Sequence, residues 1–175
     1  MEEDVLELEN RRRIYQLLLK YPGMYLREME KELGLAVGVL EYNLSYLEKK
    51  EILMVEREGN RKRYFIREGF SWGDKITVGL LRQEIPRRIV IFLMLNENAS
   101  FQDVLAQFKI SKSTLSFHMK KLTEANIVGS EKDGRTTNYR VLDPDNTARV
   151  ILTYKASFLD VVVDRFAEVW GDMGK

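Results

Sequence analysis

The stretch "SKSTLSFHMKKL", residues 111–122, combines small hydroxyl residues and basic side chains with three apolar residues at helical spacing. Leu115, Met119 and Leu122 follow an i, i+4, i+7 pattern, which predicts a helix that buries one face. The same pattern occurs 75 positions earlier in "AVGVLEYNLSYL", residues 36–47, where nearly all of the positive charge is absent. The fold and the function of the chain depend on what this pair of stretches means.

The sequence repeats at this offset of 75 residues, without a gap, well beyond the two stretches. The matched positions include Leu40/Leu115, Leu44/Met119, Leu47/Leu122, Ile52/Ile127, Glu56/Glu131, Gly59/Gly134 and Tyr64/Tyr139. A period this long that occurs twice indicates two copies of one small domain rather than a solenoid.

Each copy shows the same succession of predicted elements. An apolar helix ("RIYQLLLKY" and "RRIVIFLML") precedes a short helix, a tight turn and the third helix quoted above. The segments that follow, "ILMVEREGNRKRYFI" and "IVGSEKDGRTTNYRV", look like β-hairpins with a glycine at the tip. Three helices followed by a two-stranded wing form a winged helix-turn-helix, so we expect a mainly α fold with small β-wings, in two tandem copies.

These segments resemble those of known regulators. "ISKSTLSFHMKKLTEANIVGSEKDGRTTNYRV" resembles the helix-turn-helix and wing of the ArsR/MarR-like winged-helix regulators. "YPGMYLREMEKELGLAVGVLEYNLSYLEKKEILMVEREGNRKRYFI" is similar to the tandem winged-helix transcription regulators common in archaea. The resemblance covers roughly residues 10–67 and 86–142, and it implies a DNA-binding protein. Metal sensing is not implied, because the cysteines or His/Asp pairs of ArsR-type metal sensors are absent.

The domain boundaries follow from the repeat. We expect a first winged-helix domain at residues 1–70, a linker helix at residues 71–85 and a second winged-helix domain at residues 86–142. Apolar residues at three- and four-residue steps in residues 143–175 predict one long C-terminal helix of about 35–40 Å. Because a regulator that binds two half-sites needs a partner subunit, we expect a homodimer through this helix. The alternative is that the helix packs across the winged domains of its own chain.

The composition excludes several classes of function. The 175 residues include no cysteine, so disulfides, zinc fingers and thiol nucleophiles are excluded. There is no phosphate-binding glycine loop, and the single histidine, His118, lies beside the apolar stripe, where a core position is expected. The sequence has no run of about 18 apolar residues and no apolar region of a secretory signal. We therefore expect a cytoplasmic, non-enzymatic protein with no cofactor, metal site or membrane segment.

The second copy carries the candidate DNA-reading surface. Residues 74–142 hold 11 Lys/Arg against 7 Asp/Glu, a net charge of +4. Lysines on the outward face of the third helix would neutralise phosphates, and serines would hydrogen-bond base edges. The candidate DNA-binding residues are Ser111, Lys112, Ser113, Ser116, Phe117 and Lys120, with Lys132 and Arg135 in the wing. An ordinary solvated helix face is the alternative, since no outward Arg, Asn or Gln offers a bidentate base contact.

The first copy is less suited to DNA. The outward positions of its third helix include the carboxylate of Glu41, which phosphate repels, and Tyr42, which we retain as a candidate DNA contact. Its wing reads "GNRKRYF", and the adjacent Arg61, Lys62 and Arg63 predict a phosphate or minor-groove contact. The sequence is compatible with contact between the third helix of this copy and either DNA or a protein.

Two interpretations of function therefore stand side by side. The first is a sequence-specific regulator of transcription that binds double-stranded DNA, with the third helix of the second copy in the major groove and basic wings on the backbone. The second is a tandem winged-helix scaffold that binds a protein of a transcription or chromosome-associated complex, because fold alone does not decide function.

Overall fold

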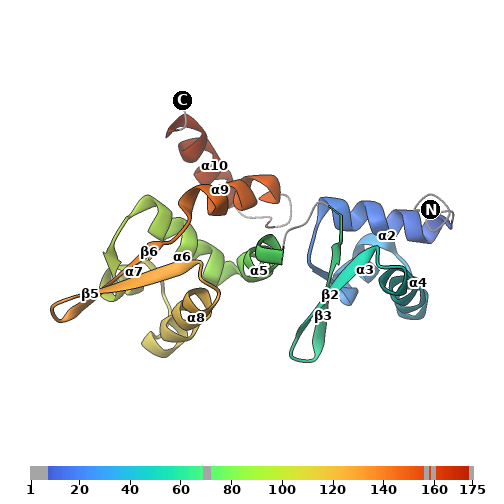
Figure 1. Ribbon diagram of the computed structural model, residues 1–175, viewed down its shortest axis with the longest axis horizontal. Helices are drawn as coiled ribbons and strands as arrows, with labels where there is room; N and C mark the ends of the chain where they lie inside the picture. The colour runs from blue at the N-terminus through green and yellow to red at the C-terminus, as the bar shows by residue number, and fades with distance from the viewer. Residues whose placement is uncertain (1–7, 69–71, 156–157, 159–160, 174–175) are drawn as a thin grey trace. The chain divides into compact units, whose positions relative to one another are not determined.

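The computed structural model describes residues 8–68, 72–155, 158 and 161–173. The chain divides into two units, Met1–Lys75 and Ile76–Lys175. In Figure 1 the first unit runs from blue to green and the second from green to red. Each unit is mainly helical and holds a small three-stranded antiparallel sheet, which confirms the predicted fold class.

The described part of the first unit contains a helix-turn-helix and a wing. Its helices are α2 (Glu9–Lys20), α3 (Leu26–Leu33) and α4 (Val37–Lys49). Its strands, in the order β1-β3-β2, are β1 (Met24–Tyr25), β2 (Leu53–Glu58) and β3 (Arg61–Ile66). Gly34 ends α3 and Gly59 forms the hairpin turn, and both have positive φ angles that glycine adopts at little cost.

The core of the first unit is built from the apolar faces of its helices. Leu40, Leu44 and Leu47 of α4 are at most 1% exposed, as the apolar stripe predicts. They belong to one cluster with Ile14 of α2 and Met29 of α3. Burial of side chains of this size contributes about 1.5–3 kcal/mol each. The stripe therefore determines which face of α4 is left for other contacts.

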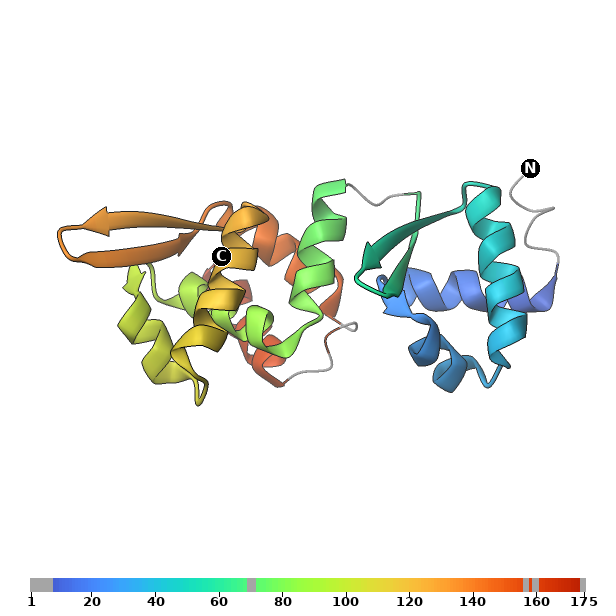
Figure 2. The ribbon, with the colours of Figure 1, turned by 90° about the horizontal axis from the view of Figure 1, so that it is seen from below.

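The second unit repeats this arrangement at the same offset. Helices α6 (Glu84–Leu95) and α8 (Lys112–Glu124) begin and end 75 residues after α2 and α4. The other repeated elements are β4 (Ala99–Ser100), α7 (Phe101–Gln107), β5 (Val128–Asp133) and β6 (Thr136–Val141), with the sheet order β4-β6-β5. Figure 2 shows the β5–β6 hairpin, in orange, extending from the helices of this unit. The internal repeat is therefore present in the structure.

Further helices lie outside the two repeats. Helix α5 (Trp72–Leu81) lies within the range expected for a linker helix. Helices α9 (Pro144–Thr153) and α10 (Val161–Met173) follow the second wing. Asp143 caps α9, because its carboxylate accepts a hydrogen bond from the N–H of Asn146 at 3.0 Å. None of the helices in the described ranges has both the length and the hydrophobicity needed to span a bilayer.

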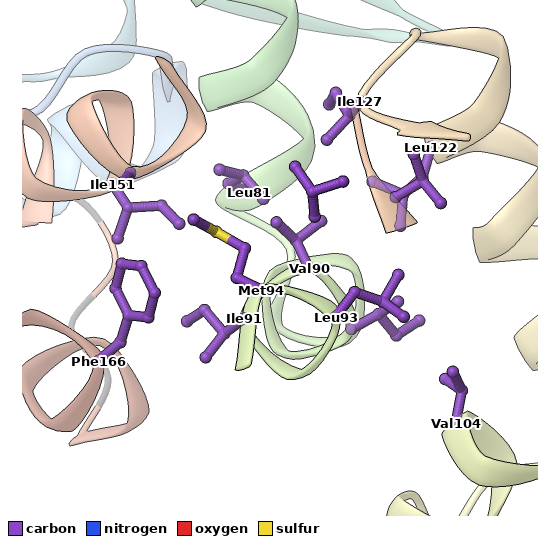
Figure 3. Close-up of a cluster of buried hydrophobic side chains, with 14 of the residues drawn as sticks. Leu81, Val90, Ile91, Leu93, Met94, Val104, Leu122, Ile127, Ile151 and Phe166 are labelled. Atoms are coloured by element: carbon purple, nitrogen blue, oxygen red, sulfur yellow. The ribbon is translucent and has the colours of Figure 1, made fainter. Parts of the chain in front are cut away.

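The core of the second unit includes its C-terminal helices. Figure 3 shows α6 end-on, with Ile91 directed toward the side of Ile151 in α9 and Phe166 in α10. Leu93 points to the opposite side, where Leu122 of α8 lies. Ile151 is completely buried and Phe166 is 1% exposed. Helix α6 thus packs against the winged helix on one side and against the C-terminal helices on the other.

The prediction of one long helix in residues 143–175 is wrong. The structure has two helices, of which α9 ends at Thr153 and α10 begins at Val161. Buried residues of both helices, Ile151 and Phe166, belong to the same core cluster. A straight helix of the expected length, about 35–40 Å, would carry its second half past a domain of this size. Two shorter helices allow both apolar faces to pack on one core.

The third strand of each sheet was not predicted from the sequence. Strands β1 and β4 are two residues long, and each pairs in antiparallel fashion with the second strand of the wing, β3 or β6. A strand of two residues is too short to show the alternation by which strands are recognised.

Candidate nucleic-acid interface

The candidate interface of the second unit begins at the N-terminus of α8. Ser111 is the N-cap residue, and its hydroxyl accepts a hydrogen bond from the N–H of Thr114 at 3.1 Å. The same oxygen lies 2.9 Å from the hydroxyl oxygen of Ser113 and 2.8 Å from that of Thr114. These contacts order the exposed start of the helix, where the helix dipole favours an anion.

One face of α8 is buried and the other is open, as the apolar stripe predicts. Leu115 and Leu122 are completely buried. Phe117 is 54% exposed. Lys120 forms a surface ion pair of 3.7 Å with Glu124, which is weak and leaves the ammonium accessible. The candidate residues exposed on this helix are Lys112, Ser113, Ser116, Phe117 and Lys120.

His118 lies on the buried side of α8. Its side chain is 9% exposed, and its Nδ1 atom is buried with no hydrogen-bond partner in the described part of the chain. Burial lowers the pKa of His118, and the nearby charge of Lys121 lowers this pKa further. In the described ranges, no group of three or more His, Asp or Glu side chains is placed to hold a metal ion.

The wing of the second unit carries the remaining candidates. Lys132 and Arg135 are both exposed. Lys132 lies opposite Thr137 in the β5–β6 ladder, and Gly134, with a φ of 60°, forms the turn directly before Arg135. The two cations therefore lie near the tip of the hairpin.

The corresponding helix of the first unit, α4, exposes a different surface. Tyr42 is 64% exposed and Val39 is 39% exposed, and Glu41 and Ser45 are also open to solvent. Asn43 takes the place of His118 and is buried, and its Nδ2 donates a hydrogen bond to the carbonyl of Val39 at 2.7 Å. This face therefore combines apolar, aromatic and acidic groups and lacks the lysines of α8.

Arg63 does not lie where the sequence suggested. It was predicted to contact DNA together with Arg61 and Lys62, which are exposed, but its side chain is only 3% exposed. Its Nε and Nη2 atoms donate hydrogen bonds to Glu58 Oε2 at 3.1 and 2.8 Å. Its guanidinium carbon lies 4.3 Å from the centre of the Tyr25 ring. The prediction for Arg63 is therefore wrong, whereas Arg61 and Lys62 remain predictions.

Arg63 is buried on the face of β3 that points away from the core cluster of the first unit. It lies two residues before Phe65, which is completely buried, so both side chains leave β3 on the same face, opposite to that of the core residues Tyr64 and Ile66. Arg63 also lies opposite Tyr25 in the β1–β3 ladder. Because Tyr64 and Ile66 are the core residues of β3, alternation alone places Arg63 on the outer face, and its burial there could not be predicted from the sequence.

Tyr25, Glu58 and Arg63 form a connected group, which we call the wing latch. The hydroxyl of Tyr25 donates a hydrogen bond to Glu58 Oε2 at 2.6 Å, the same oxygen that accepts from Arg63. Burial and the hydrogen bond to Glu58 raise the pKa of Tyr25, so this hydroxyl stays protonated. The wing latch joins the start of α3 to both strands of the β2–β3 hairpin.

Comparisons with known proteins concern mainly the second unit. Residues 86–130 match the family model described as "Bacterial regulatory protein, arsR family". An uncharacterised HTH-type transcriptional regulator of Methanocaldococcus jannaschii is 30% identical over 140 residues, which cover 80% of this chain. The chain spans 35% of the length of that relative. Both matches are to regulators by name.

Two solved structures of regulators align with part of this chain. Reduced HlyU from Vibrio cholerae is 20% identical, with a TM-score of 0.42, and the alignment covers 47% of this chain and 86% of HlyU. An ArsR-like transcriptional regulator from Rhodococcus is also 20% identical, with a TM-score of 0.39 and coverages of 59% and 93%. With its two repeated units, this chain is a tandem winged helix-turn-helix protein, and residues 86–130 of its second unit are similar to the arsR family of bacterial regulatory proteins.

Proposed function

We propose that this chain is a transcription regulator that binds duplex DNA in a sequence-specific manner through its second unit. The observation that carries the proposal is the exposed face of α8, where lysines and serines surround a buried apolar stripe. This helix lies in the segment that matches the arsR family, and the relative from M. jannaschii is named a transcriptional regulator. A role on the chromosome would place the protein in the cytoplasm.

Each candidate residue has a chemical role in this proposal. The hydroxyls of Ser113 and Ser116 hydrogen-bond base edges in the major groove, and Phe117 packs against a thymine methyl group. Lys112 and Lys120 neutralise phosphates on either side of the groove. The candidates at the helix start and in the wing, which lie along the sugar-phosphate backbone, are Ser111, Lys132 and Arg135.

The test is the salt dependence of DNA binding. A duplex selected from a random-sequence library by the full chain would be titrated with wild type and with the double variant Lys112→Ala, Lys120→Ala. Each phosphate contact contributes about 0.9 to the slope of log K against log salt, so the double variant should lower the slope by about 2. It should also weaken binding at low salt by at least about tenfold.

The matched control removes two lysines elsewhere. Lys31 and Lys49 are exposed on α3 and α4 of the first unit, so the variant Lys31→Ala, Lys49→Ala makes the same change in net charge. This control should retain both the affinity and the slope of the wild type. Tight binding that neither the α8 variant nor salt weakens would contradict the proposal.

The DNA-bound form that we propose is a homodimer formed through the C-terminal helices. Ile151 and Phe166 already pack in the core of their own unit, and among the described side chains of α9 and α10 the large exposed apolar ones are Leu152 (39% exposed) and Val169 (47% exposed). In sedimentation velocity, wild type should show a dimer, and Leu152→Glu with Val169→Glu should dissociate it because two carboxylates would be desolvated. A dimer that survives both changes would place the contact elsewhere.

A second candidate function applies to the first unit. There the exposed helix face carries Glu41 at the position that Ser116 occupies in the second unit, and a carboxylate disfavours contact with phosphate. This observation favours a protein partner, such as a component of the transcription machinery, over DNA for the first unit. Tyr42, Arg61 and Lys62 remain candidates for DNA contact, and the titrations described next distinguish the two roles.

A further inference from the structure

A groove lies within the first unit between the start of α3, the exposed face of α4 and the wing. Its volume is about 830 Å³, in the range of ligand-binding pockets. Leu26 and Tyr64 line its apolar part. Glu41 lies on the α4 side, and Arg61 and Lys62 lie on the wing side, so these two walls carry opposite charges. The start of α3 adds one charge of each sign, Glu28 and Arg27, and Arg27 forms an ion pair with Glu30 at 2.7 Å.

The wing wall of this groove is held in place before any partner binds. Tyr25 lines the groove, and through the wing latch its ring and hydroxyl are joined to Arg63 and Glu58. The guanidinium of Arg63 also donates a long hydrogen bond of 3.4 Å to the carbonyl of Gly23, just before β1. A preformed groove reduces the entropy that a ligand must overcome on binding.

The charges of the groove differ from those at the same places in the second unit. Glu41 and Ser45 of α4 correspond to Ser116 and Lys120 of α8 at the offset of 75 residues. The first unit thus has a carboxylate where the second has none, and it lacks the lysine that faces solvent on α8. Duplex DNA offers only negative charge along its backbone, so it would meet attraction at the wing and repulsion at Glu41.

We propose that this groove binds a polypeptide segment of a partner protein. An acidic side chain of the segment pairs with Arg61 and Lys62, an apolar side chain packs on Leu26 and Tyr64, and a basic side chain approaches Glu41. A polypeptide fits because it carries both charges and an apolar group within a few residues. The proposal rests on the protein-docking role suggested above for the first unit and is independent of DNA binding by the second unit.

The test is an NMR titration of the full-length chain with two synthetic peptides. The probe, acetyl-GSDLKSG-amide, carries an acidic, an apolar and a basic residue in succession, and the reference peptide, acetyl-GSSLSSG-amide, lacks the charges. We expect the probe to shift backbone amide signals at Leu26, Glu41 and Lys62 and to bind more tightly than the reference.

Substitutions that copy the second unit sharpen the test. Glu41→Ser, and separately Arg61→Thr with Lys62→Thr, introduce the residues that the second copy has at these positions. Each should weaken binding of the probe by about threefold, the effect of one exposed ion pair. Glu32→Ser removes an exposed carboxylate of α3 that does not line the groove, and it should leave the affinity unchanged.

Several outcomes would overturn the proposal. They are the absence of shifts in the groove, equal binding of both peptides, and a probe affinity that Glu41→Ser does not change. A further titration adds the selected DNA duplex to the chain and tests whether the groove binds DNA instead of a peptide. Shifts confined to α8 would agree with the proposal, whereas displacement of the probe by the duplex would assign the groove to DNA. If the duplex shifts no signals of α8, the proposal that the second unit binds DNA is contradicted. The result of the peptide titration tests the groove independently of that outcome.

Discussion

Protonation of His118 would place a charge inside the second unit. Its Nδ1 atom is buried without a hydrogen-bond partner in the described residues. Burial, and then the charge of Lys121, lowers the pKa of His118 below its ordinary value of 6.5. The unfolded chain therefore binds this proton more readily than the folded chain does. As a result, the free energy of unfolding should fall as the pH drops below about 6.5.

We expect the substitution His118→Asn to reduce this pH dependence. The first copy already accommodates Asn43 at the equivalent helix position, where its Nδ2 donates to a backbone carbonyl at 2.7 Å. Melting temperatures of both proteins would be measured at about pH 7.5 and pH 5.5. The wild type should lose more stability between the two values, since carboxylate effects common to both proteins cancel in the difference. Equal losses would show that His118 is not the group responsible.

The start of α8 depends on one hydroxyl group. Ser111 accepts a hydrogen bond from the N–H of Thr114, and replacement of such a cap by alanine costs about 1 kcal/mol. Ser111→Ala should therefore speed hydrogen exchange of the amides in the first turn of α8 about fivefold. Ser116→Ala, an exposed change in the middle of the same helix, should leave their exchange rates unchanged. Similar exchange rates in both variants would contradict a capping role for Ser111.

Elements with a long apolar pattern could be predicted from the sequence. Elements without such a pattern could not be predicted. The stripe at Leu115, Met119 and Leu122 placed α8 and its exposed face correctly, because burial of one face requires that spacing. The break between α9 and α10 was missed, since apolar residues continue at helical steps on both sides of it. The spacing of apolar residues indicates which side chains are buried. It does not indicate how long the domain is, and therefore where a helix must end so that the next one can pack on the same core.

The two units have separate hydrophobic cores, so a cavity in one should weaken that unit first. Leu44 is 1% exposed in the core of the first unit, and Leu44→Ala should lower its stability by about 2–5 kcal/mol. The amides of α8 should keep their protection from hydrogen exchange, and affinity for the selected duplex should change by less than about twofold. The equivalent change in the second core, Leu122→Ala, should reduce DNA binding. Equal loss of DNA binding in both variants would contradict this division of roles.

The candidate surfaces were only partly visible in the sequence. The lysines and serines of α8 could be assigned to an exposed face because the repeat separated fold-forming positions from variable ones. The groove of the first unit could not be found this way, because it joins Leu26, Glu41 and Arg61 from three separate elements. Its shape depends on strand register and on the wing latch, which combine residues far apart in the chain.

Because only the first unit has the residues of the wing latch, we expect the β2–β3 hairpin to be stiffer than the β5–β6 hairpin. In the second copy its three positions are occupied by Ser100, Asp133 and Asn138, which offer neither an aromatic ring nor a guanidinium. The β5–β6 hairpin can therefore bend at lower energetic cost than the β2–β3 hairpin. A flexible hairpin can adjust to the curvature of a DNA duplex. A stiff hairpin keeps the wall of the groove in one position for a bound peptide segment. We therefore expect three side chains to make the wing of the first unit more rigid than that of the second.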